Sequence, residues 1–352
     1  MKVAVYAIAL NEKQFVKRWA DSCKDADFRF ILDTGSTDGT VEEASAQGVD
    51  CIIASIKPWR FDDARNVSLA LIPEDIDYCI ALDMDEVLLP GWKEELEKAH
   101  KQGLTRPRYK YTWSWNADGT PGLEYGGDKI HSRHGYRWKH PVHEVITADR
   151  TREIQGWVDL EIHHYPDNTK SRGQYLPLLE LSVKEDPSDD RNAYYYAREL
   201  FFNRQYEIAS KEFERHLSLP RAVWRPERAA SMRYIAKCRP QEAKHWLAKA
   251  VEEDPNRREA LVELAQWGYE NRNWELSLNY AKKALDIKEK PLDYLCEDFA
   301  WGAKPLDLAA IAAYNLGKYR EALEFNTKAL EFEPNNERLK SNQEYYKEKA
   351  NS

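Results

Sequence analysis

The first half of the chain alternates short apolar runs with stretches of helical periodicity. The apolar runs predict strands at residues 2–10, 28–33, 51–55 and 78–82. The segments between and after them predict helices at residues 12–23, 37–47, 62–70 and 92–101. Strands that alternate with helices of this length indicate βαβ units around a parallel sheet. Because ligands of such sheets bind at the carboxyl ends of the strands, the loops after the four strands are the first places to look for a site.

From Asp190 onward the pattern is almost purely helical, and it repeats. One small residue recurs in each repeat, at Ala209, Ala243, Ser277 and Ala322, so the spacings are 34, 34 and 45 residues. The first two spacings equal the period of tetratricopeptide repeats, which are helical hairpins that stack into a solenoid. The third carries 11 extra residues, and the polar segment 336–350 is expected to cap the array. The chain therefore predicts an α/β domain over residues 1–186 and a helical repeat domain over residues 187–352.

The composition excludes several classes of protein. Hydrophobic residues make up 42% and charged residues 32%, which is typical of a globular chain. The net charge of -8 disfavours broad binding to nucleic acid or anionic membranes, although a local basic groove stays open. No apolar run reaches the roughly 20 residues of a membrane span, and the first residues lack signal-peptide features, so we expect a cytoplasmic protein. Five scattered cysteines without CxxC spacing argue against a disulfide framework or a zinc site.

The second predicted strand ends at Asp33, in the motif DTGSTDGT. Gly35 permits a tight turn there, and Ser36, Thr37 or Asp38 can cap the following helix. The dinucleotide fingerprint GxGxxG is absent. An acid at this position can instead accept a hydrogen bond from a nucleobase N–H or a ribose hydroxyl, and the alternative is a well-capped turn that binds nothing.

The fourth predicted strand ends in LDMDE, which holds Asp83 and Asp85. Two residues apart in extended chain, both carboxylates project to the same side and repel each other unless a cation neutralises them. Mg²⁺ and Mn²⁺ prefer oxygen ligands together with substrate phosphates. The upstream motif FDDARN adds Arg65, which can contact a nucleotide or a phosphate. The alternative is an acidic turn in solvent.

The ordered motifs ALNE, ILDTGSTDGT, FDDARNVSL and ALDMDEVL together resemble the glycosyltransferase family 2 domain, which has the GT-A fold. The resemblance covers roughly residues 1–180. It extends further because some family members, such as the bacteriocin S-glycosyltransferases, carry a tetratricopeptide array directly behind the catalytic domain. It implies a nucleotide-sugar donor, most simply a UDP-sugar, and a divalent cation, Mn²⁺ or Mg²⁺.

The resemblance also implies roles for individual residues. Asp33 matches the acid that contacts uracil, and Arg65 matches an element near the donor. Asp83 and Asp85 match the acidic pair that binds ribose and metal, with Asp85 the better metal ligand. Asn11 and Glu12 match a pair that lines the nucleotide pocket.

The chain departs from the wider family in lacking an E-D base pair followed by QxxRW, so a non-processive hexosyltransferase is expected and its base is unassigned. Glu144 is the leading candidate for a base that deprotonates an acceptor hydroxyl or thiol, with His143 second. Either His163 or His164 is a candidate third metal ligand, since neutral imidazole suits Mn²⁺. Each of these histidines has a purely structural hydrogen bond as its alternative.

Aromatic residues supply candidates for sugar or acceptor contacts. Trp113 and Trp115 lie in a Gly- and aromatic-rich stretch and are expected to share a strand face. Trp59, in KPWRF, is a candidate for stacking on the donor from a loop. The alternative for all three is packing in the core.

These observations predict a glycosyltransferase whose helical array orients a polypeptide acceptor or forms a homodimer interface. Three alternatives stay open. The acceptor can be a modified base in DNA, for which a basic face around residues 106–110 and 133–139 would count, or a lipid-linked or cell-surface glycan. The third alternative is a non-catalytic tetratricopeptide adaptor.

Overall fold

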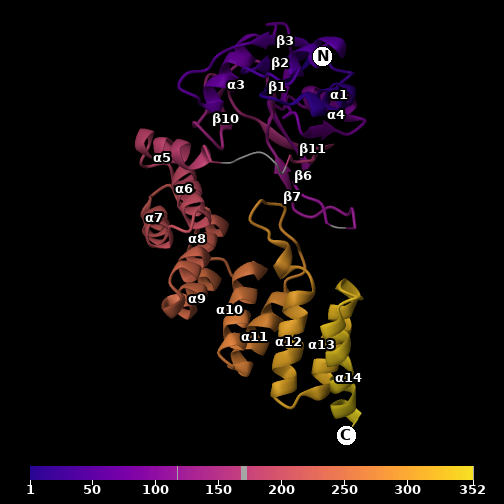
Figure 1. Ribbon diagram of the computed structural model, residues 1–352, viewed down its shortest axis with the longest axis vertical. Helices are drawn as coiled ribbons and strands as arrows, with labels where there is room; N and C mark the ends of the chain where they lie inside the picture. The colour runs from indigo at the N-terminus through magenta and orange to yellow at the C-terminus, as the bar shows by residue number, and fades with distance from the viewer. Residues whose placement is uncertain (117, 168–172, 352) are drawn as a thin grey trace. The chain divides into compact units, whose positions relative to one another are not determined.

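The computed structural model describes residues 1–116, 118–167 and 173–351. The chain divides into two compact units, Met1–Ser182 and Val183–Ser352 (Figure 1). This division lies four residues before the boundary expected from the sequence, 183 against 187. Each unit is built around its own core.

The first unit is centred on a sheet with the strand order β3-β2-β1-β4-β8. Its parallel strands are β1 (Val3–Ala9), β2 (Phe28–Asp33), β3 (Asp50–Ile53) and β4 (Tyr78–Ala81), and β8 (Ile130–Ser132) is antiparallel at the edge. The accompanying helices are α1 (Lys13–Ser22), α2 (Thr40–Ala46), α3 (Phe61–Ala70) and α4 (Trp92–Lys101). The predicted parallel sheet of alternating strands and helices is thereby confirmed.

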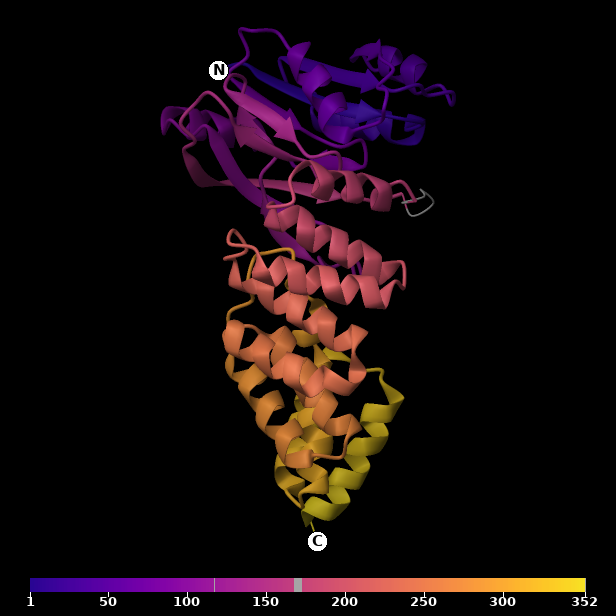
Figure 2. The same ribbon diagram turned by 90° about the vertical axis from the view of Figure 1, so that its left-hand side faces the viewer.

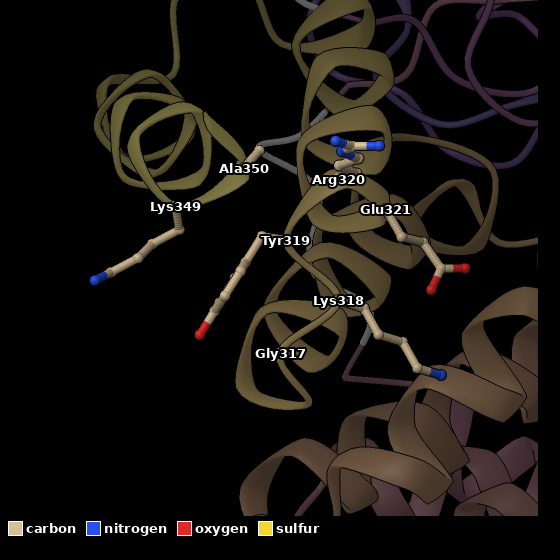
Figure 3. A pocket seen from close by; sticks show the side chains of 7 residues that line it. All are labelled: Gly317, Lys318, Tyr319, Arg320, Glu321, Lys349 and Ala350. Atoms are coloured by element: carbon tan, nitrogen blue, oxygen red, sulfur yellow. The ribbon is translucent and has the colours of Figure 1, made fainter. Parts of the chain in front are cut away.

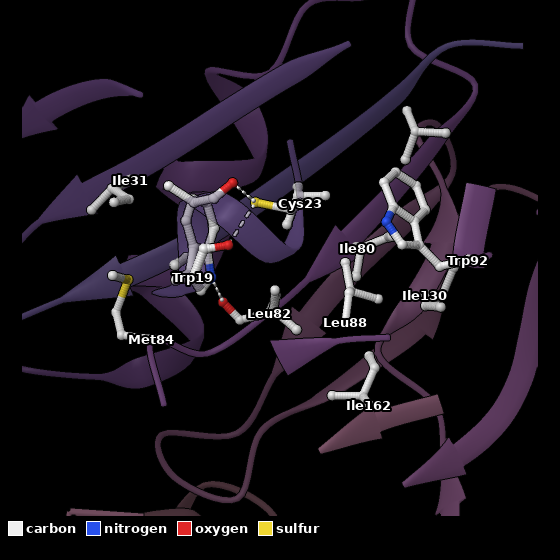
Figure 4. Close-up of a cluster of buried hydrophobic side chains, with 14 of the residues drawn as sticks. Trp19, Cys23, Ile31, Ile80, Leu82, Met84, Leu88, Trp92, Ile130 and Ile162 are labelled. Carbon is white, nitrogen blue, oxygen red and sulfur yellow. Dashed lines mark hydrogen bonds between the residues drawn. The ribbon is translucent and has the colours of Figure 1, made fainter. Parts of the chain in front are cut away.

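Both faces of this sheet are covered, which explains why its central strands are apolar at nearly every position. In β1, Val3 and Val5 pack with α1, α2 and α4, whereas Ala4 and Tyr6 pack with α3. Figure 4 shows the first of these cores, where the indole N–H of Trp19 donates to the carbonyl of Leu82 over 3.0 Å. That bond ties α1 to the end of β4, next to the acidic motif.

A second sheet, in the order β5-β11-β6-β7, was not foreseen from the sequence. It consists of β5 (Glu86–Leu88), β6 (Arg106–Thr112), β7 (Glu124–Gly127) and β11 (Gln155–His164). A hairpin of β9 (Tyr136–Lys139) and β10 (Val145–Ala148) lies between them in the chain. The antiparallel pairing of β11 with β5 sets His164 opposite Glu86, so the end of β11 arrives beside the acidic motif.

Gly127 lies opposite Tyr109 in the β6–β7 pair, and a Cβ there would overlap the buried Tyr109 ring. We expect Gly127→Ala to destabilise the first unit by about 1–3 kcal/mol, the usual cost of overpacking a core. Thermal denaturation measures the effect. Adding Tyr109→Leu makes room for the methyl group and is expected to make the alanine substitution cheaper, as a double-mutant cycle would show. Equal cost in both backgrounds would contradict the contact.

The second unit is a series of helical hairpins followed by a terminal helix (Figure 2). The hairpins are α6 (Asp190–Phe202) with α7 (Tyr206–Ser218), α8 (Arg225–Cys238) with α9 (Ala243–Glu253), α10 (Arg258–Glu270) with α11 (Trp274–Asp286), and α12 (Ala303–Asn315) with α13 (Tyr319–Phe332). The hairpins confirm the tetratricopeptide-like array. The helix α14 (Glu337–Asn351) stands where the capping helix was expected, and α5 (Tyr175–Glu185) joins the two units.

Small residues let the paired helices approach, as the repeat pattern predicts. Ala209, Ser277 and Ala322 have no exposed surface, whereas Ala243 is half-buried at the start of α9. A Cβ on Gly268 would lie 2.8 Å from the backbone nitrogen of Ser277, so α10 and α11 touch through their backbones. The first helices of successive hairpins also pack on one another, α8 on α6 and α10, and α10 on α12.

Glu227 in α8 is an acid almost fully buried in this array. Burial raises the pKa of its carboxyl to about 7, although a hydrogen bond from the Tyr294 hydroxyl lowers it. The folded chain therefore keeps a proton that the unfolded chain releases near its ordinary pKa of 4.5. Because each pKa unit corresponds to about 1.4 kcal/mol, we expect the free energy of unfolding to fall by about 3 kcal/mol as the pH rises between these two values.

The Glu227→Gln variant cannot ionise and is expected to lose this pH dependence. Urea unfolding followed by helical circular dichroism at about pH 5 and about pH 8 compares the two chains. The parent is expected to be less stable at the higher pH and the variant nearly unchanged. A variant that keeps the parent's pH dependence would contradict the role of this carboxyl.

Candidate functional site

The candidate site lies at the carboxyl-end edge of the first sheet. Asp33 ends β2, Asp83 and Asp85 follow β4, and His164 ends β11. Arg65 comes from α3, which covers one face of the same sheet. Five side chains from four segments therefore lie along the edge where a parallel sheet places its ligands.

Asp33 has no exposed surface, and its two carboxylate oxygens differ. Oδ1 accepts hydrogen bonds from the backbone N–H groups of Gly35 and Ser36, each over 2.9 Å. Oδ2 is buried and has no hydrogen-bond partner among the described residues. Since a buried acceptor without a partner is costly, this oxygen is available for a ligand N–H or O–H. The helix α2 begins after Gly39, whose left-handed φ of 92° makes the turn, and of the three predicted caps Asp38 accepts a hydrogen bond from the N–H of Thr40, the first residue of α2, over 3.0 Å.

The loop after β1 is fastened to the loop after β2. Asn11 has a φ of 56°, and its side-chain oxygen accepts from the N–H of Thr37 over 2.8 Å. Its own N–H donates to the Ser36 hydroxyl, and the N–H of Glu12 donates to the Thr40 hydroxyl. Asn11 therefore shapes the edge of the site, and direct contact of Asn11 or Glu12 with a donor stays a prediction.

Arg65 is buried and forms ion pairs with two carboxylates. Its Nη2 lies 2.7 Å from Asp83 Oδ1 and its Nε lies 2.5 Å from Glu144 Oε1, while its guanidinium stacks 4.9 Å over the Trp138 ring. Its Nη1 is buried without a hydrogen-bond partner in the described part of the chain. The side chain is thus held firmly and still has a donor to offer.

Lys129, just before β8, was missed by the sequence analysis. Its Nζ lies 2.6 Å from Asp83 Oδ2 and 2.7 Å from Glu86 Oε1, and the Tyr111 hydroxyl also donates to Glu86. Burial raises the pKa of Asp83, but Arg65 and Lys129 outweigh it and hold this pKa well below its usual range. Both oxygens of Asp83 are therefore engaged by cations, which favours donor binding over metal ligation for this residue. Only the pairing of β8 with β4, which the sequence pattern did not show, brings Lys129 here.

Asp85 lies beside His164, one of the two histidines predicted as a third metal ligand. His164 Nδ1 lies 2.9 Å from the carbonyl oxygen of Trp113, and its Nε2 lies 3.3 Å from Asp85 Oδ2. Burial lowers the pKa of His164, but the hydrogen bond and charge of Asp85 outweigh it and the pKa is raised. With Nδ1–H donating to the carbonyl of Trp113, Nε2 is the ring nitrogen that faces Asp85, and either a proton on Nε2 or a bound cation can lie between the two side chains.

A complete metal cage is not present. Within residues 1–116, 118–167 and 173–351, no group of three or more His, Cys, Asp or Glu side chains is arranged to hold a metal ion. Asp85 and His164 fit a divalent cation as two ligands, and the others would have to be donor oxygens and water. The metal prediction therefore stays a prediction that depends on the donor.

His163 points elsewhere. Its Nε2 lies 3.3 Å from Glu161 Oε2, and its ring makes an edge contact with Trp115. Neighbouring residues of a strand face opposite sides, so only one of the two histidines can meet Asp85. Of the two metal candidates, the geometry favours His164.

The two candidates for the base lie in the turn between β9 and β10. Glu144 is held by Arg65, whose Nε donates to its carboxylate. His143 has a φ of 50°, and its ring makes an edge contact with Tyr175 at 5.6 Å. The left-handed backbone positions this turn, and the identity of the base stays a prediction.

Trp113 and Trp115, the predicted sugar or acceptor contacts, both contact His164. Trp113 stacks on His164 with ring centroids 4.3 Å apart, and Trp115 stacks on Tyr165 and donates its indole N–H to the carbonyl of His164. Trp59 packs edge-on against Phe61, 5.1 Å away, beside an apolar core. Contacts of these three tryptophans with a sugar or acceptor stay predictions.

A surface hollow of about 430 Å³ lies far along the chain, at Gly317–Glu321 with Lys349 and Ala350. Figure 3 shows that its labelled side chains splay in different directions and do not converge on a common point. It shares no residue with the carboxylate edge, and we place no ligand there.

Comparisons with known proteins reach only part of the chain. No protein-family model matches it, and no curated protein matches it. It is similar to the Pseudomonas aeruginosa protein pilF, with 15% identity, 49% of this chain and 71% of that chain covered, and a TM-score of 0.38. It is similar to the C-terminal part of a TPR repeat-containing protein from Cytophaga hutchinsonii, with 17% identity, 51% and 66% covered, and a TM-score of 0.41. It is also similar to YrrB, described as a TPR protein with an unusual peptide-binding site, with 17% identity, 46% and 78% covered, and a TM-score of 0.35.

These likenesses span about half of this chain, and at such TM-scores they carry no argument about function. The array itself is established by its own helical hairpins. None of the helices in the described residues is long and apolar enough to cross a membrane. The five cysteines, all of them described, form no disulfide.

Proposed function

We propose that the first unit is a nucleotide-sugar-dependent glycosyltransferase of the GT-A type and that the helical array binds its polypeptide acceptor. One observation carries the proposal. Several polar side chains converge at one edge of the sheet, and they still have hydrogen-bonding or charge-pairing capacity that a ligand can use. Asp33 has a buried oxygen without a hydrogen-bond partner among the described residues, Arg65 has a spare buried N–H, and Asp85 Oδ2 lies 3.3 Å from His164 Nε2. A nucleoside diphosphate with a divalent cation supplies a donor, an acceptor and a positive charge in one ligand.

Each of these residues then has a defined task. Asp33 Oδ2 accepts a hydrogen bond from the base, and Arg65 Nη1 donates to the ribose or a phosphate. Asp83, fixed by Arg65 and Lys129, keeps lone pairs for a ribose hydroxyl. Asp85 and His164 would hold the cation, which when bound neutralises the charge that builds on the departing diphosphate.

The reaction forms a bond from an acceptor oxygen, nitrogen or sulfur to the anomeric carbon. The bond from that carbon to the diphosphate breaks, and its electron pair leaves with the nucleoside diphosphate. The acceptor proton passes to a base, for which Glu144 and His143 are the candidates. Glu144 can take the proton if substrate draws Arg65 toward the diphosphate, since this weakens the Arg65–Glu144 ion pair.

Release of nucleotide without acceptor tests the proposal. The chain is incubated with UDP-, GDP- and TDP-sugars in Mn²⁺, in Mg²⁺ and in chelator. We expect one nucleotide to be released, faster with metal than with chelator. A donor that raises the melting temperature without turnover would support the donor site and show that the acceptor is required. Neither release nor binding of any donor would overturn the proposal.

The alternative acceptors make different demands on the surface. For DNA, the basic residues around 106–110 should be free, yet Arg106 pairs with Asp128 and Glu153, and Lys110 pairs with Glu124 and Glu161. A salt titration of DNA binding discriminates, because phosphate contacts weaken steeply with salt. Flotation with lipid vesicles tests the lipid-linked or cell-surface acceptor.

The second candidate function is a non-catalytic protein-binding adaptor. It is favoured by the repeat array, whose helical hairpins make up the whole second unit up to the terminal helix. The edge of the first sheet is also partly neutralised without metal, since Arg65 and Lys129 both bind Asp83. Nucleotide binding that is absent, or unchanged in Asp85→Asn, would favour the adaptor.

A further inference from the structure

The 11 extra residues in the repeat array form a segment with its own set of contacts. Between the end of α11 and the start of α12, residues 288–302 contain one short turn of helix, η2 (Asp298–Ala300). In Figure 1 this is the long orange loop that precedes α12. We call residues 290–300 the insert.

The insert contacts the first helices of hairpins that precede it by 30 to 100 residues. Asp293 binds Arg257 at the start of α10, with oxygen-to-nitrogen distances of 2.6 and 3.1 Å. Glu297 lies 2.7 Å from Arg233 of α8, and its N–H donates to Glu259 of α10. These contacts join one loop to two separate repeats.

Tyr294 is the aromatic anchor of the insert. Its ring stacks on Tyr195 of α6 at 6.0 Å and contacts Trp224 at 5.6 Å. Its hydroxyl donates to Glu227 of α8 over 2.7 Å. Leu295, next in the chain, is also buried. The side of the array formed by α6, α8 and α10, with the residues named in these contacts, is the first-helix face.

The basic residues of the first-helix face do not depend on the insert alone. Arg233 also binds Glu263 through two hydrogen bonds of 2.8 Å, and Arg257 also lies 3.3 Å from Glu259. Each arginine would keep one carboxylate of the array if the insert left, Glu263 for Arg233 and Glu259 for Arg257. Losing the insert would therefore leave neither Arg233 nor Arg257 as an unpaired buried charge, which is the usual large cost of breaking such pairs.

We propose that the first-helix face is a binding site for an acidic peptide with an aromatic side chain, and that the insert occupies this site in cis. The insert is acidic and aromatic, and it is held mainly by side chains of other repeats. These contacts resemble those of a bound peptide more than those of a packed helix. A partner peptide of the same chemistry and the insert exclude each other. This inference does not depend on glycosyl transfer.

Deletion of residues 290–300 restores the 34-residue spacing and exposes the first-helix face. The probe is a labelled synthetic peptide with the insert sequence KPLDYLCEDFA, carrying Cys296→Ser. We expect it to bind the full chain lacking the insert at least about tenfold more tightly than the intact chain, because the intact chain must first release its own insert. A peptide that also carries Asp293→Asn and Tyr294→Ala is the control and is expected to bind weakly. A folded deletion variant that does not bind the probe, or an intact chain that binds it equally well, would overturn the proposal.

Two further measurements on the chain keep the test valid should the deletion variant not fold. Tyr294→Ala in the intact chain loosens the insert and is expected to tighten binding of the probe. In hydrogen exchange of the unchanged chain, amides of residues 292–298 are expected to exchange well before those of α10 and α12. Exchange of the insert only together with those helices, or no gain in Tyr294→Ala, would show an integral part of the fold and contradict displacement.

Discussion

Asp85→Asn is expected to reduce metal-dependent release of nucleotide at least about 100-fold, since electrostatic stabilisation of a leaving group is commonly worth that much. The amide keeps the size of the side chain but removes the charge that faces His164 Nε2. The metal then loses one of the two protein ligands that the geometry offers. Release assays in Mn²⁺ over a range of donor concentrations measure the effect.

The control for this prediction is Asp21→Asn. Asp21 is an exposed residue of α1, and within the described residues its carboxylate forms an ion pair with Lys17 alone. Its replacement is therefore expected to change neither nucleotide release nor stability. Both variants should melt within a few degrees of the parent. If Asp85→Asn releases nucleotide at the parental rate, the assignment of Asp85 fails.

Arg65→Met is expected to destabilise the first unit by about 3–5 kcal/mol, the cost of removing one partner of a buried ion pair. The substitution leaves Asp83 and Glu144 without the guanidinium that lies between them. The contact with the Trp138 ring is also lost. Chemical denaturation, followed by Trp fluorescence, measures the loss of stability.

Arg65→Lys separates stability from donor binding. Lysine keeps one positive charge for Asp83 but cannot bridge two carboxylates and still offer a third N–H in a fixed plane. We expect a milder loss of stability, with donor affinity reduced at least about tenfold. Parental donor affinity in a folded Arg65→Lys variant would show that the spare N–H of Arg65 serves no ligand.

The sequence predicts the first sheet and the helical array well because both arise from local periodicity. The strands ending at Asp33 and just before Asp83 are apolar on both faces, and their boundaries can be read within one or two residues. The repeats are likewise predicted by small residues that recur every 34 residues. The positions of Asp33 and Asp85 at the ends of their strands follow, and so does the choice of two histidines, His163 and His164, as neighbours of Asp85.

The second sheet and the ion-pair network could not be predicted from local sequence patterns, because they join residues far apart in the chain. Arg65 and Glu144 are 79 residues apart, and Lys129 reaches Asp83 from 46 residues away. Lys129 is placed by the strand β8 and Glu144 by the hairpin of β9 and β10, and these strands are too short to show a period. The sequence therefore could not show that Asp83 is engaged by two cations, or which of His163 and His164 faces Asp85.

The most direct test of the donor site is a crystal structure of the chain with UDP and Mn²⁺, with anomalous scattering measured at the manganese edge. The account predicts an anomalous peak in contact with Asp85 and His164, a diphosphate on that metal, and the base against Asp33. A nucleotide bound elsewhere, or a saturated crystal with neither metal nor nucleotide at this edge, would contradict the account and leave the helical array as the functional part of the chain.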